Sequence, residues 1–396
     1  MNYCIHCKGF LHNIIDLKEI PIVNNFIKIK TNKKIKTKIS ICKKCKLFQH
    51  ENILKKNEIF NKNYPYISSS SNNLKKHFHS ISKKINIKNK FFLLEIGSND
   101  GSFLENFKNK KISHLGIDPS KIACNEAKKK GLNITNDFFS LKLSKKIIKK
   151  YGHADIIFSA NTLAHVENLN DVLEGIDLLL SKNGFLYMEN IYLNSLLKKN
   201  LYDQLYHEHM YTYSIESINN IFSKYNLFID SINFNNMQGG SFFIKLSRNK
   251  KFKHSIKQII KNENNKSLLK KKTKDILNKK IQLSLSQIKK LIEKVNLENN
   301  NLTGYGASAK CVMLINLLNL TKNDIKFIVD NTKYKQNTLI PGTNIPIIAP
   351  KHTNNYLGDY CVIFSWNFAL EIIKKEKNRN FKTKWVLPIP KLKIIK

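Results

Sequence analysis

One segment in the first third of the chain constrains the fold more than any other. Residues 93–104 read LLEIGSNDGSFL, an apolar strand that runs into a glycine-containing turn and then a helix. Gly97 and Gly101 allow the backbone to approach a ligand closely. Asp118 ends the next predicted strand about 20 residues later, the spacing of an acid that accepts hydrogen bonds from ribose hydroxyls. Asp118 is also a suitable helix N-cap, but the two features together favour nucleoside binding.

Predicted strands and helices alternate over two stretches of the sequence. The first stretch runs from about residue 91 to 246, with strands at 91–96, 114–118, 154–160 and 185–190. Helices are predicted between them at 102–108, 120–130 and 170–181, after an earlier helix at 72–84. The second stretch has strands near 302–304, 325–329, 360–364 and 385–389. This alternation predicts parallel sheets covered by helices, and therefore an α/β fold.

Polar residues follow several of the predicted strands, at the edge where open α/β sheets bind ligands. Asn99 occupies the second glycine position of the GxGxxG dinucleotide pattern, which argues against a dinucleotide loop. Asp137 follows the third strand, where a carboxylate can accept from an adenine amino group or simply form a turn. The fourth strand ends in a polar run that includes Asn161 and His165.

Four of the seven cysteines form two pairs with the same internal spacing: Cys4, Cys7, Cys42 and Cys45. Two CxxC pairs can offer four thiolates to one tetrahedral zinc ion, and four protein ligands make such a site structural and not catalytic. The gap between the pairs is longer than that of a zinc ribbon, so a small subdomain is expected inside it. The alternative is a set of buried or redox-active thiols.

The formal net charge of +39 has two explanations. One is a polyanionic partner such as nucleic acid. The other is compositional drift, which we favour because Arg occurs only at Arg248 and Arg379, whereas phosphate and base recognition favours Arg. No apolar run approaches the roughly 18 residues of a membrane span, and the N-terminus lacks a secretory pattern. A cytoplasmic protein is therefore expected.

Three motifs together resemble one family of enzymes. Residues 95–101 (EIGSNDG), 116–120 (GIDPS) and 161–165 (NTLAH) closely resemble S-adenosylmethionine-dependent sugar C-methyltransferases, which make branched-chain deoxysugars. The resemblance extends over nearly the whole chain, through the cysteine quartet and residues 206–209 (YHEH), 304–310, 329–336 and 341–347. It departs at Cys311, where the family usually has a glycine.

The resemblance implies a fold, domain bounds and cofactors. The expected fold is a class I methyltransferase Rossmann-like domain, with a small N-terminal zinc domain and a second, C-terminal Rossmann-like α/β domain. The expected bounds are 1–60 for the zinc domain, 61–246 for the methyltransferase domain, 247–300 for a helical connection and 301–396 for the C-terminal domain. The expected cofactors are S-adenosylmethionine and Zn²⁺. The methyl donor is expected to contact Glu95, Gly97, Asn99, Gly101, Asp118, Asp137, Asn161 and His165.

Carbon methylation needs a base to remove a proton next to a ketone and groups that stabilise the resulting enolate. Histidine titrates near neutrality and suits this task. By resemblance, His209 is the general base, while Glu208 and Tyr206 orient it, bind the sugar or steer the enolate. Tyr66 is preferred over Tyr64 as a tyrosine that reaches the active site. The YHEH segment lacks the HExxH spacing of zinc hydrolases, so it does not indicate a metal hydrolase.

The predicted substrate contacts are Asn190, Gly239, Gly306 and Lys310. Asn190 follows a strand, and Gly239 lies in a glycine turn that a simple hairpin would explain equally well. Gly306 begins a Rossmann-type turn before a helix, whose N-terminus suits a phosphate, and Lys310 adds charge. By resemblance the C-terminal domain holds a nucleotide-sugar diphosphate; the alternative is a degenerate Rossmann domain that only packs.

The sequence therefore predicts an enzyme that C-methylates a nucleotide-linked keto-deoxysugar through an enolate. The alternatives are an RNA or other small-acceptor methyltransferase with a structural zinc domain, and a non-catalytic zinc protein that binds nucleic acid. The expected partner is a small-molecule nucleotide sugar, with no membrane and no nucleic acid. The sequence does not indicate the sugar, the nucleotide, the methylated carbon or the oligomeric state.

Overall fold

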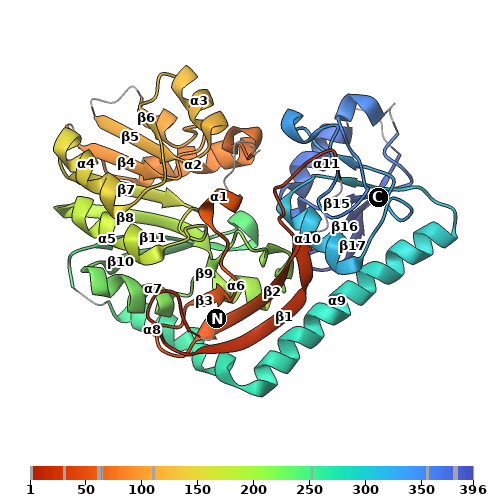
Figure 1. Cartoon of the computed structure of the whole chain (residues 1–396), viewed down its shortest axis with the longest axis horizontal. Coiled ribbons are helices and arrows are strands. Elements are labelled where there is room, and N and C mark those ends of the chain that lie inside the picture. Colours follow the sequence, from red (N-terminus) through yellow and green to blue (C-terminus); the bar gives the residue numbers. More distant parts are fainter. Residues whose placement is uncertain are drawn as a thin grey trace.

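A computed structural model describes residues 3–29, 33–59, 64, 66–88, 90–108, 112–250, 253–353, 356–377 and 382–395. The described part contains three sheets, an N-terminal, a central and a C-terminal sheet (Figure 1). The central sheet and the C-terminal sheet stand on either side of a long two-stranded arm from the N-terminal sheet. The helix α9 (Lys271–Leu297) runs along the base and connects the two sides.

The central sheet has seven strands in the order β10-β11-β8-β7-β4-β5-β6. Their bounds are β4 (Phe92–Ile96), β5 (Ser113–Asp118), β6 (Ile134–Asn136), β7 (Ala154–Ala160), β8 (Leu180–Ile191), β10 (Phe228–Asn235) and β11 (Ser241–Ser247). Neighbours from β6 to β8 are parallel, and β11 is antiparallel to both of its neighbours. All five residues of β4 are buried, as expected for a strand covered on both faces.

The helices around this sheet are α1 (Lys56–Ile59), α2 (Asn72–Lys84), α3 (Lys121–Lys129), α4 (Leu141–Tyr151), α5 (Leu169–Leu179), α6 (Leu193–Lys198), α7 (Ile215–Phe222) and α8 (His254–Glu263). Five of them, α2, α3, α4, α5 and α7, begin where a small polar side chain caps them. Ser71, Ser120, Ser140, Asn168 and Ser214 each accept a hydrogen bond from a backbone N–H of the first turn.

The central sheet reverses its winding between β4 and β7. From β4 the chain adds β5 and β6 on one side, and then crosses back to add β7 and β8 on the other. At such a switch point the loops after the two central strands diverge and leave a crevice at the carboxyl edge. The loops that follow β4 and β7 are those whose polar residues the sequence singled out.

The C-terminal sheet repeats this arrangement with six strands in the order β14-β13-β12-β15-β16-β17. The strands are β12 (Leu302–Tyr305), β13 (Ile328–Val329), β14 (Ile347–Ile348), β15 (Tyr360–Ile363), β16 (Lys384–Leu387) and β17 (Lys393–Ile395). All are parallel except β17, and the switch point lies between β12 and β15. The helices α10 (Ala309–Leu318) and α11 (Ala369–Lys377) cover the sheet, and α10 is buried along its whole length.

The N-terminal sheet has the antiparallel order β1-β2-β3-β9. Its strands are β1 (Leu11–Pro21), β2 (Lys34–Cys42), β3 (Phe48–His50) and β9 (Tyr211–Thr212). The long gap between the cysteine pairs therefore contains the β1–β2 arm, where a small subdomain was expected. Because β9 comes from the segment after YHEH, the N-terminal sheet is joined directly to the predicted catalytic motif.

Local patterns predicted most elements, with three differences. The helix expected at 102–108 is only a short 3₁₀ helix, Leu104–Phe107. The strand expected at 185–190 is part of the longer β8, and α4 lies in a stretch where no helix was predicted. The Lys-rich stretch between the central and C-terminal sheets, within residues 247–300, forms the amphipathic helices α8 and α9. Across the described ranges, no helix combines the length and apolar character needed to cross a membrane.

Candidate active site

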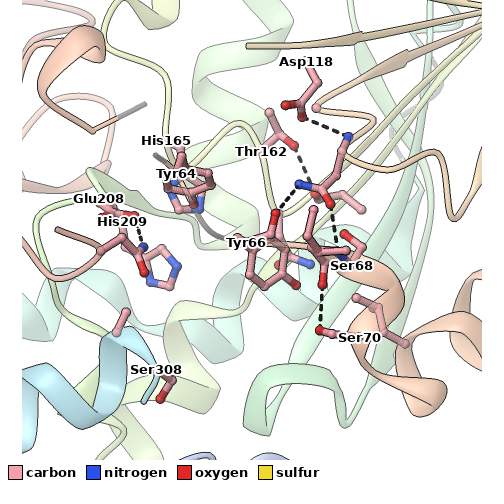
Figure 2. A pocket seen from close by; sticks show the side chains of 18 of the residues that line it. Tyr64, Tyr66, Ser68, Ser70, Asp118, Thr162, His165, Glu208, His209 and Ser308 are labelled. Atoms are coloured by element: carbon pink, nitrogen blue, oxygen red, sulfur yellow. Dashed lines mark hydrogen bonds between the residues drawn. The ribbon is translucent and has the colours of Figure 1, made fainter. Parts of the chain in front are cut away.

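One cavity of about 470 Å³ lies between the central and C-terminal sheets and is lined by parts of all three units (Figure 2). The central unit contributes the loops after β4, β5, β6 and β7 together with the YHEH segment. The C-terminal unit contributes the loops after β12, β13 and β15, and the N-terminal unit contributes Asn24 and Lys56. The cavity therefore forms where the carboxyl edges of the two parallel sheets face each other.

The loop after β4 is held against the loop after β7. Gly97 has φ +76°, and a Cβ at this position would collide with Oγ1 of Thr162. Asn99 also adopts a positive φ, and its backbone N–H donates to Oδ2 of Asp118 at 2.9 Å. The other carboxylate oxygen of Asp118 accepts from the N–H of Ser120 at 2.8 Å. Asp118 thus fixes the loop and holds Ser120, which caps the next helix, while its own buried side chain still lines the cavity.

Two carboxyl groups at this site, those of Asp118 and Glu95, are buried, and burial disfavours their charged forms. Burial raises the pKa of Asp118 to about 6, against the effect of its two backbone donors. Burial also raises the pKa of Glu95 well above its usual value, and the charges of Asp118 and Asp100 add to this rise. Glu95 Oε2 is buried and has no hydrogen-bond partner among the described residues. A ligand that brings positive charge or hydroxyl donors would lower the free-energy cost of ionising these buried carboxyl groups.

Of the other residues that were predicted to contact the methyl donor, three line the cavity and one does not. Asn161 and His165 line the cavity from the loop after β7. Asp137 also lines it, but is exposed and accepts from the N–H of Phe138 within its own turn. Gly101 lies away from the cavity: a Cβ there would collide with the side chain of Leu132, so this glycine serves internal packing.

The imidazole of His209 is held in one tautomer by its two hydrogen bonds. Nδ1 lies 2.7 Å from the carbonyl oxygen of Gln204, which can only accept, so Nδ1 carries the proton. Nε2 is then the basic atom, and it accepts from the hydroxyl of Tyr206 at 2.8 Å. Burial lowers the pKa of His209 well below its usual value, and nearby His165 adds to this. The ring is therefore neutral, with its free lone pair at Nε2.

Glu208 lines the same part of the cavity and is almost fully buried. Its Oε2 accepts a 2.7 Å hydrogen bond from Nδ2 of Asn24, whereas its Oε1 is buried without a partner among the described residues. Burial raises the pKa of Glu208 to about 7. This carboxyl group can therefore change its charge in the neutral range.

Both candidate tyrosines line the cavity, at different places. Figure 2 shows Tyr66 towards Ser68, whereas Tyr64 lies on the side of His165. Burial raises the pKa of Tyr64 well above its usual value, and the charge of Glu208 is the next cause. Tyr64 is therefore near Glu208, and Tyr66 is also near the YHEH segment, since the charge of Tyr66 raises the pKa of Tyr206.

Of the predicted substrate contacts, Gly306 and Lys310 line the cavity, and Asn190 and Gly239 do not. Nζ of Lys310 donates hydrogen bonds to Oδ1 of Asn367 at 2.9 Å and to Oε1 of Gln238 at 3.3 Å. Burial lowers its pKa to about 8.

Gly239 is required for packing between the units. A Cβ at Gly239 would lie 2.6 Å from the ring of Trp366 and 2.7 Å from Leu201. Trp366 in turn donates from Nε1 to Oδ2 of the buried Asp203 at 2.6 Å. The turn joins the antiparallel strands β10 and β11, so it is a hairpin turn, the alternative that the sequence left open. Gly239, with φ +88°, also lets the C-terminal unit pack closely against the central unit.

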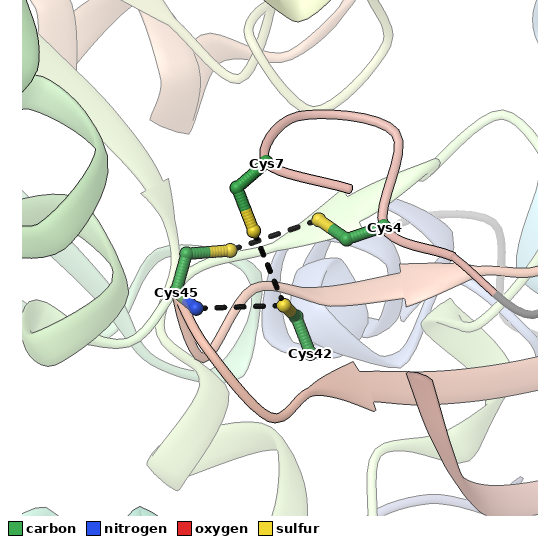
Figure 3. Close-up of side chains that lie close together, drawn as sticks. All are labelled: Cys4, Cys7, Cys42 and Cys45. Carbon is green, nitrogen blue, oxygen red and sulfur yellow. Dashed lines mark hydrogen bonds between the residues drawn. The ribbon is translucent and has the colours of Figure 1, made fainter. Parts of the chain in front are cut away.

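The four cysteines of the quartet converge at the end of the β1–β2 arm (Figure 3). Their Sγ atoms all lie within 4.8 Å of one another, with Cys4 and Cys45 at 3.7 Å and Cys7 and Cys42 at 3.4 Å. Tetrahedral zinc with Zn–S bonds of about 2.3 Å places sulfurs about 3.8 Å apart, so the donor set fits that geometry. A Cβ at Gly9 would crowd two of these sulfurs.

Comparison with known proteins finds matches over most of the chain. A family model described as a methyltransferase domain matches residues 71–232, and one described as the C-methyltransferase C-terminal domain matches residues 236–390. The C-methyltransferase NovU of Streptomyces niveus is 25% identical over 365 residues, which cover 90% of this chain and 87% of NovU. The chain belongs to the S-adenosylmethionine-dependent C-methyltransferases.

Solved structures of methyltransferases match somewhat under half of this C-methyltransferase. An S-adenosylmethionine-dependent methyltransferase of Anabaena variabilis is 17% identical, with a TM-score of 0.37; the match covers 49% of this chain and 91% of that one. Magnesium protoporphyrin IX methyltransferase of Synechocystis, solved with S-adenosylhomocysteine, is 14% identical, with a TM-score of 0.34; that match covers 44% of this chain and 83% of the other.

The residues of the central loops fit the methyl donor. S-adenosylmethionine carries a sulfonium and an ammonium group, and the loops present buried carboxyl groups at Glu95 and Asp118. Asp118 has the position of a ribose acceptor, at the end of the strand next to the glycine loop. This C-methyltransferase thus has an acidic pocket within a strongly basic chain, and this contrast favours a cationic ligand at this place.

We expect Asp118→Ala to weaken donor binding by about 10- to 100-fold, the effect of losing hydrogen bonds to a charged acceptor. Asp137→Ala should change the affinity only a few-fold, because Asp137 is exposed and bonded within its own turn. Because the pKa of Asp118 lies at about 6, native affinity should fall as the pH drops from about 7 to 5, and this dependence should disappear in Asp118→Asn. Calorimetry with S-adenosylhomocysteine measures all three.

The cavity also contains residues that sequence reasoning did not single out. Asp330 repeats the pattern of Asp118: it follows β13 and lies just over 20 residues after Gly306, so the spacing applied to the first loop would have found it. Asn24, which also lines the cavity, had no such signal, and neither did Asp203, which is outside the lining and contacts Trp366. Their partners, Glu208 and Trp366, are more than 160 residues away in sequence.

Proposed function

We propose that this C-methyltransferase methylates a carbon atom of a nucleotide-linked keto-deoxysugar. The observation that carries the proposal is that one cavity joins two nucleoside-type loops, with His209 between them. The first loop belongs to the methyl donor. The second, in the C-terminal unit, is available for the nucleotide of the acceptor. The proposed functional units keep the bounds expected from the sequence, 1–60, 61–246, 247–300 and 301–396.

The second loop repeats the first in its hydrogen bonds. Asp330 Oδ2 accepts from the N–H of Ala307 at 2.8 Å, and Oδ1 accepts from the N–H of Thr332 at 2.8 Å. Gly306 has φ +88°, and a Cβ there would collide with Oγ of Ser365 across the switch point. Each feature has its counterpart around Asp118. This likeness supports nucleoside binding by the C-terminal unit, against the alternative of a domain that only packs.

Positive charge beside this loop suits a diphosphate. Lys310 lies in the first turn of α10, whose N-terminus presents unpaired N–H groups and a partial positive charge. Lys335 lines the cavity from the segment after Asp330. A nucleotide diphosphate held here would extend its sugar towards the YHEH segment, because that segment lines the same cavity.

The chemistry we propose follows from the groups around His209. The donor, when bound, supplies an electrophilic methyl group. Nε2 of His209 takes the proton next to the ketone, and the hydroxyl of Tyr206, which donates to Nε2 in the free protein, turns to the developing enolate oxygen. Glu208 holds a sugar hydroxyl through Oε1. The neighbouring apolar and aromatic side chains exclude water from the enolate.

We also propose that the cysteine quartet binds zinc in a structural role. Two backbone N–H groups, of Lys44 and Cys45, donate to Sγ of Cys42 at 3.3 and 3.4 Å and would stabilise a thiolate. All four ligands come from the protein, which leaves no coordination position for substrate. The site lies at the end of the arm remote from the cavity and holds β1, β2 and β3 together.

A panel of nucleotide sugars with and without a 4-keto group tests the acceptor, with methyl transfer detected by mass spectrometry. Methylation of a keto-deoxysugar nucleotide, and not of the bare nucleotide or of RNA, is the expected result. Asp330→Ala should raise KM for the sugar nucleotide about 10-fold or more and leave donor affinity unchanged. Asp118→Ala should show the opposite pattern. Equal effects of both variants on both ligands would refute separate nucleoside sites.

A further inference from the structure

The N-terminal unit reaches the predicted catalytic motif through one short segment. We call residues 20–27, at the end of β1 and after it, the strap. On one side of the strap, Nε2 of His207 lies 3.3 Å from the carbonyl oxygen of Ile20. On the other side, the N–H of Leu339 in the C-terminal unit donates to the carbonyl oxygen of Ile27 at 3.0 Å. The strap is therefore fixed between the YHEH segment and the C-terminal unit.

Asn24 lies in the middle of the strap and lines the cavity. Its Nδ2 donates to Oε2 of Glu208 at 2.7 Å. Oε1 of the same carboxyl group is buried and has no hydrogen-bond partner in the part of the chain that the structure describes. One oxygen is thus held by the N-terminal unit, and the other is left for a ligand.

We propose that Asn24 is a positioning residue of the active site, which keeps Glu208 ionised and aims its free oxygen at the acceptor. The contact between Glu208 and the acceptor rests on the proposed function, but the hydrogen bond from Asn24 to Glu208 does not. A buried carboxyl group without a donor would take up a proton and become a donor itself. The zinc-bearing unit then serves catalysis directly, through a side chain that it places in the cavity.

The electrostatics of Glu208 agree with this role. Burial raises its pKa to about 7, and the side-chain and backbone donors of Asn24, followed by the charge of Lys335, oppose the rise. The other titratable groups around it are Tyr64 and Tyr206, whose pKa values its charge raises, His165, which hydrogen-bonds the backbone of Glu208, and His209, the next residue in the chain. Burial raises the pKa of both tyrosines and lowers the pKa of both histidines, so these four groups stay neutral near pH 7. Lys310, whose pKa burial lowers to about 8, lines the same cavity, so the titration of Glu208 is identified by its own carboxyl resonance.

Carboxyl-labelled glutamate allows the titration of Glu208 to be followed by NMR in the protein without substrate. The Glu208→Gln variant identifies the resonance. Asn24→Ala should raise the pKa of Glu208 by about one to two units, the equivalent of one hydrogen bond to a charged group. Asn25→Ala is the matched control, because the side chain of Asn25 forms no hydrogen bond with any described residue. It should leave the titration unchanged.

Kinetics with the native acceptor give a second readout. A raised pKa means that less Glu208 is ionised at pH 7, so kcat/KM of Asn24→Ala should fall about 10-fold there and recover towards the native value near pH 9. A uniform loss at every pH, or an unchanged Glu208 titration in Asn24→Ala, would overturn the proposal. If the native protein methylates no sugar nucleotide, the proposed function fails, and the NMR titration still decides the role of Asn24.

Discussion

Replacing His209 by alanine should reduce kcat by about 10²- to 10⁴-fold, the range measured for the loss of a general base. The physical reason is the hydrogen-bond pattern: the carbonyl of Gln204 fixes the proton on Nδ1, so Nε2 is the basic atom that faces Tyr206 and the cavity. Donor affinity should stay at the native value, because the donor loops follow β4, β5 and β7. Steady-state kinetics and calorimetry measure the two quantities.

Proton exchange separates the base from the methyl transfer itself. In D₂O, with S-adenosylhomocysteine in place of the donor, the native enzyme should exchange the proton next to the ketone for deuterium, and His209→Ala should not. His254→Ala is the matched control, since His254 is exposed at the start of α8. A His209→Ala enzyme with near-native turnover would show that another group removes the proton.

Replacing Cys42 by serine should release the metal and unfold the N-terminal sheet. Structural zinc contributes about 10–16 kcal/mol of apparent binding free energy in small zinc domains, and that energy is folding energy. Cys42 ends β2 and receives the backbone donors of the second CxxC turn, so its loss removes both a ligand and the turn that presents Cys45. Elemental analysis and hydrogen exchange along β1 and β2 measure the result.

The remaining cysteines provide the control for the metal. Cys361 is buried in β15, within the C-terminal sheet, so Cys361→Ala should keep one zinc per chain. A strong chelator should reproduce the effect of Cys42→Ser on the native protein, and added zinc should reverse it. Native protein that contains no zinc, or Cys42→Ser protein that retains it, would exclude the proposed site.

The positive charge is spread over the structure in a way that fits compositional drift. The largest lysine-rich element, α9, uses its apolar stripe to pack on β1 and α10, while its lysines lie on the outer surface. The cavity itself combines the acidic loops around Asp118 with the buried lysines Lys310 and Lys335 beside the second loop. The charge pattern inside the cavity therefore carries more information about the ligands than the net charge does.

What the sequence alone determined is local. The alternation of apolar runs indicated the sheets, the glycine turn with Asp118 indicated the donor loop, and the cysteine spacing indicated a shared site. These patterns depend on backbone geometry and on neighbours a few residues apart, which any folded form of the chain must respect. The resemblance of YHEH to a known motif pointed to His209, but not to the atom that acts as the base.

Only the tertiary structure decided how the separate pieces meet. It assigned the Gly239 turn to packing against Trp366, placed Tyr64 near the catalytic motif, and brought the Asp330 loop to the cavity of Asp118. It also brought Asn24 to Glu208 across 184 residues of sequence. Such contacts depend on how three units dock, and docking is set by the sum of many weak long-range contacts that no local pattern records.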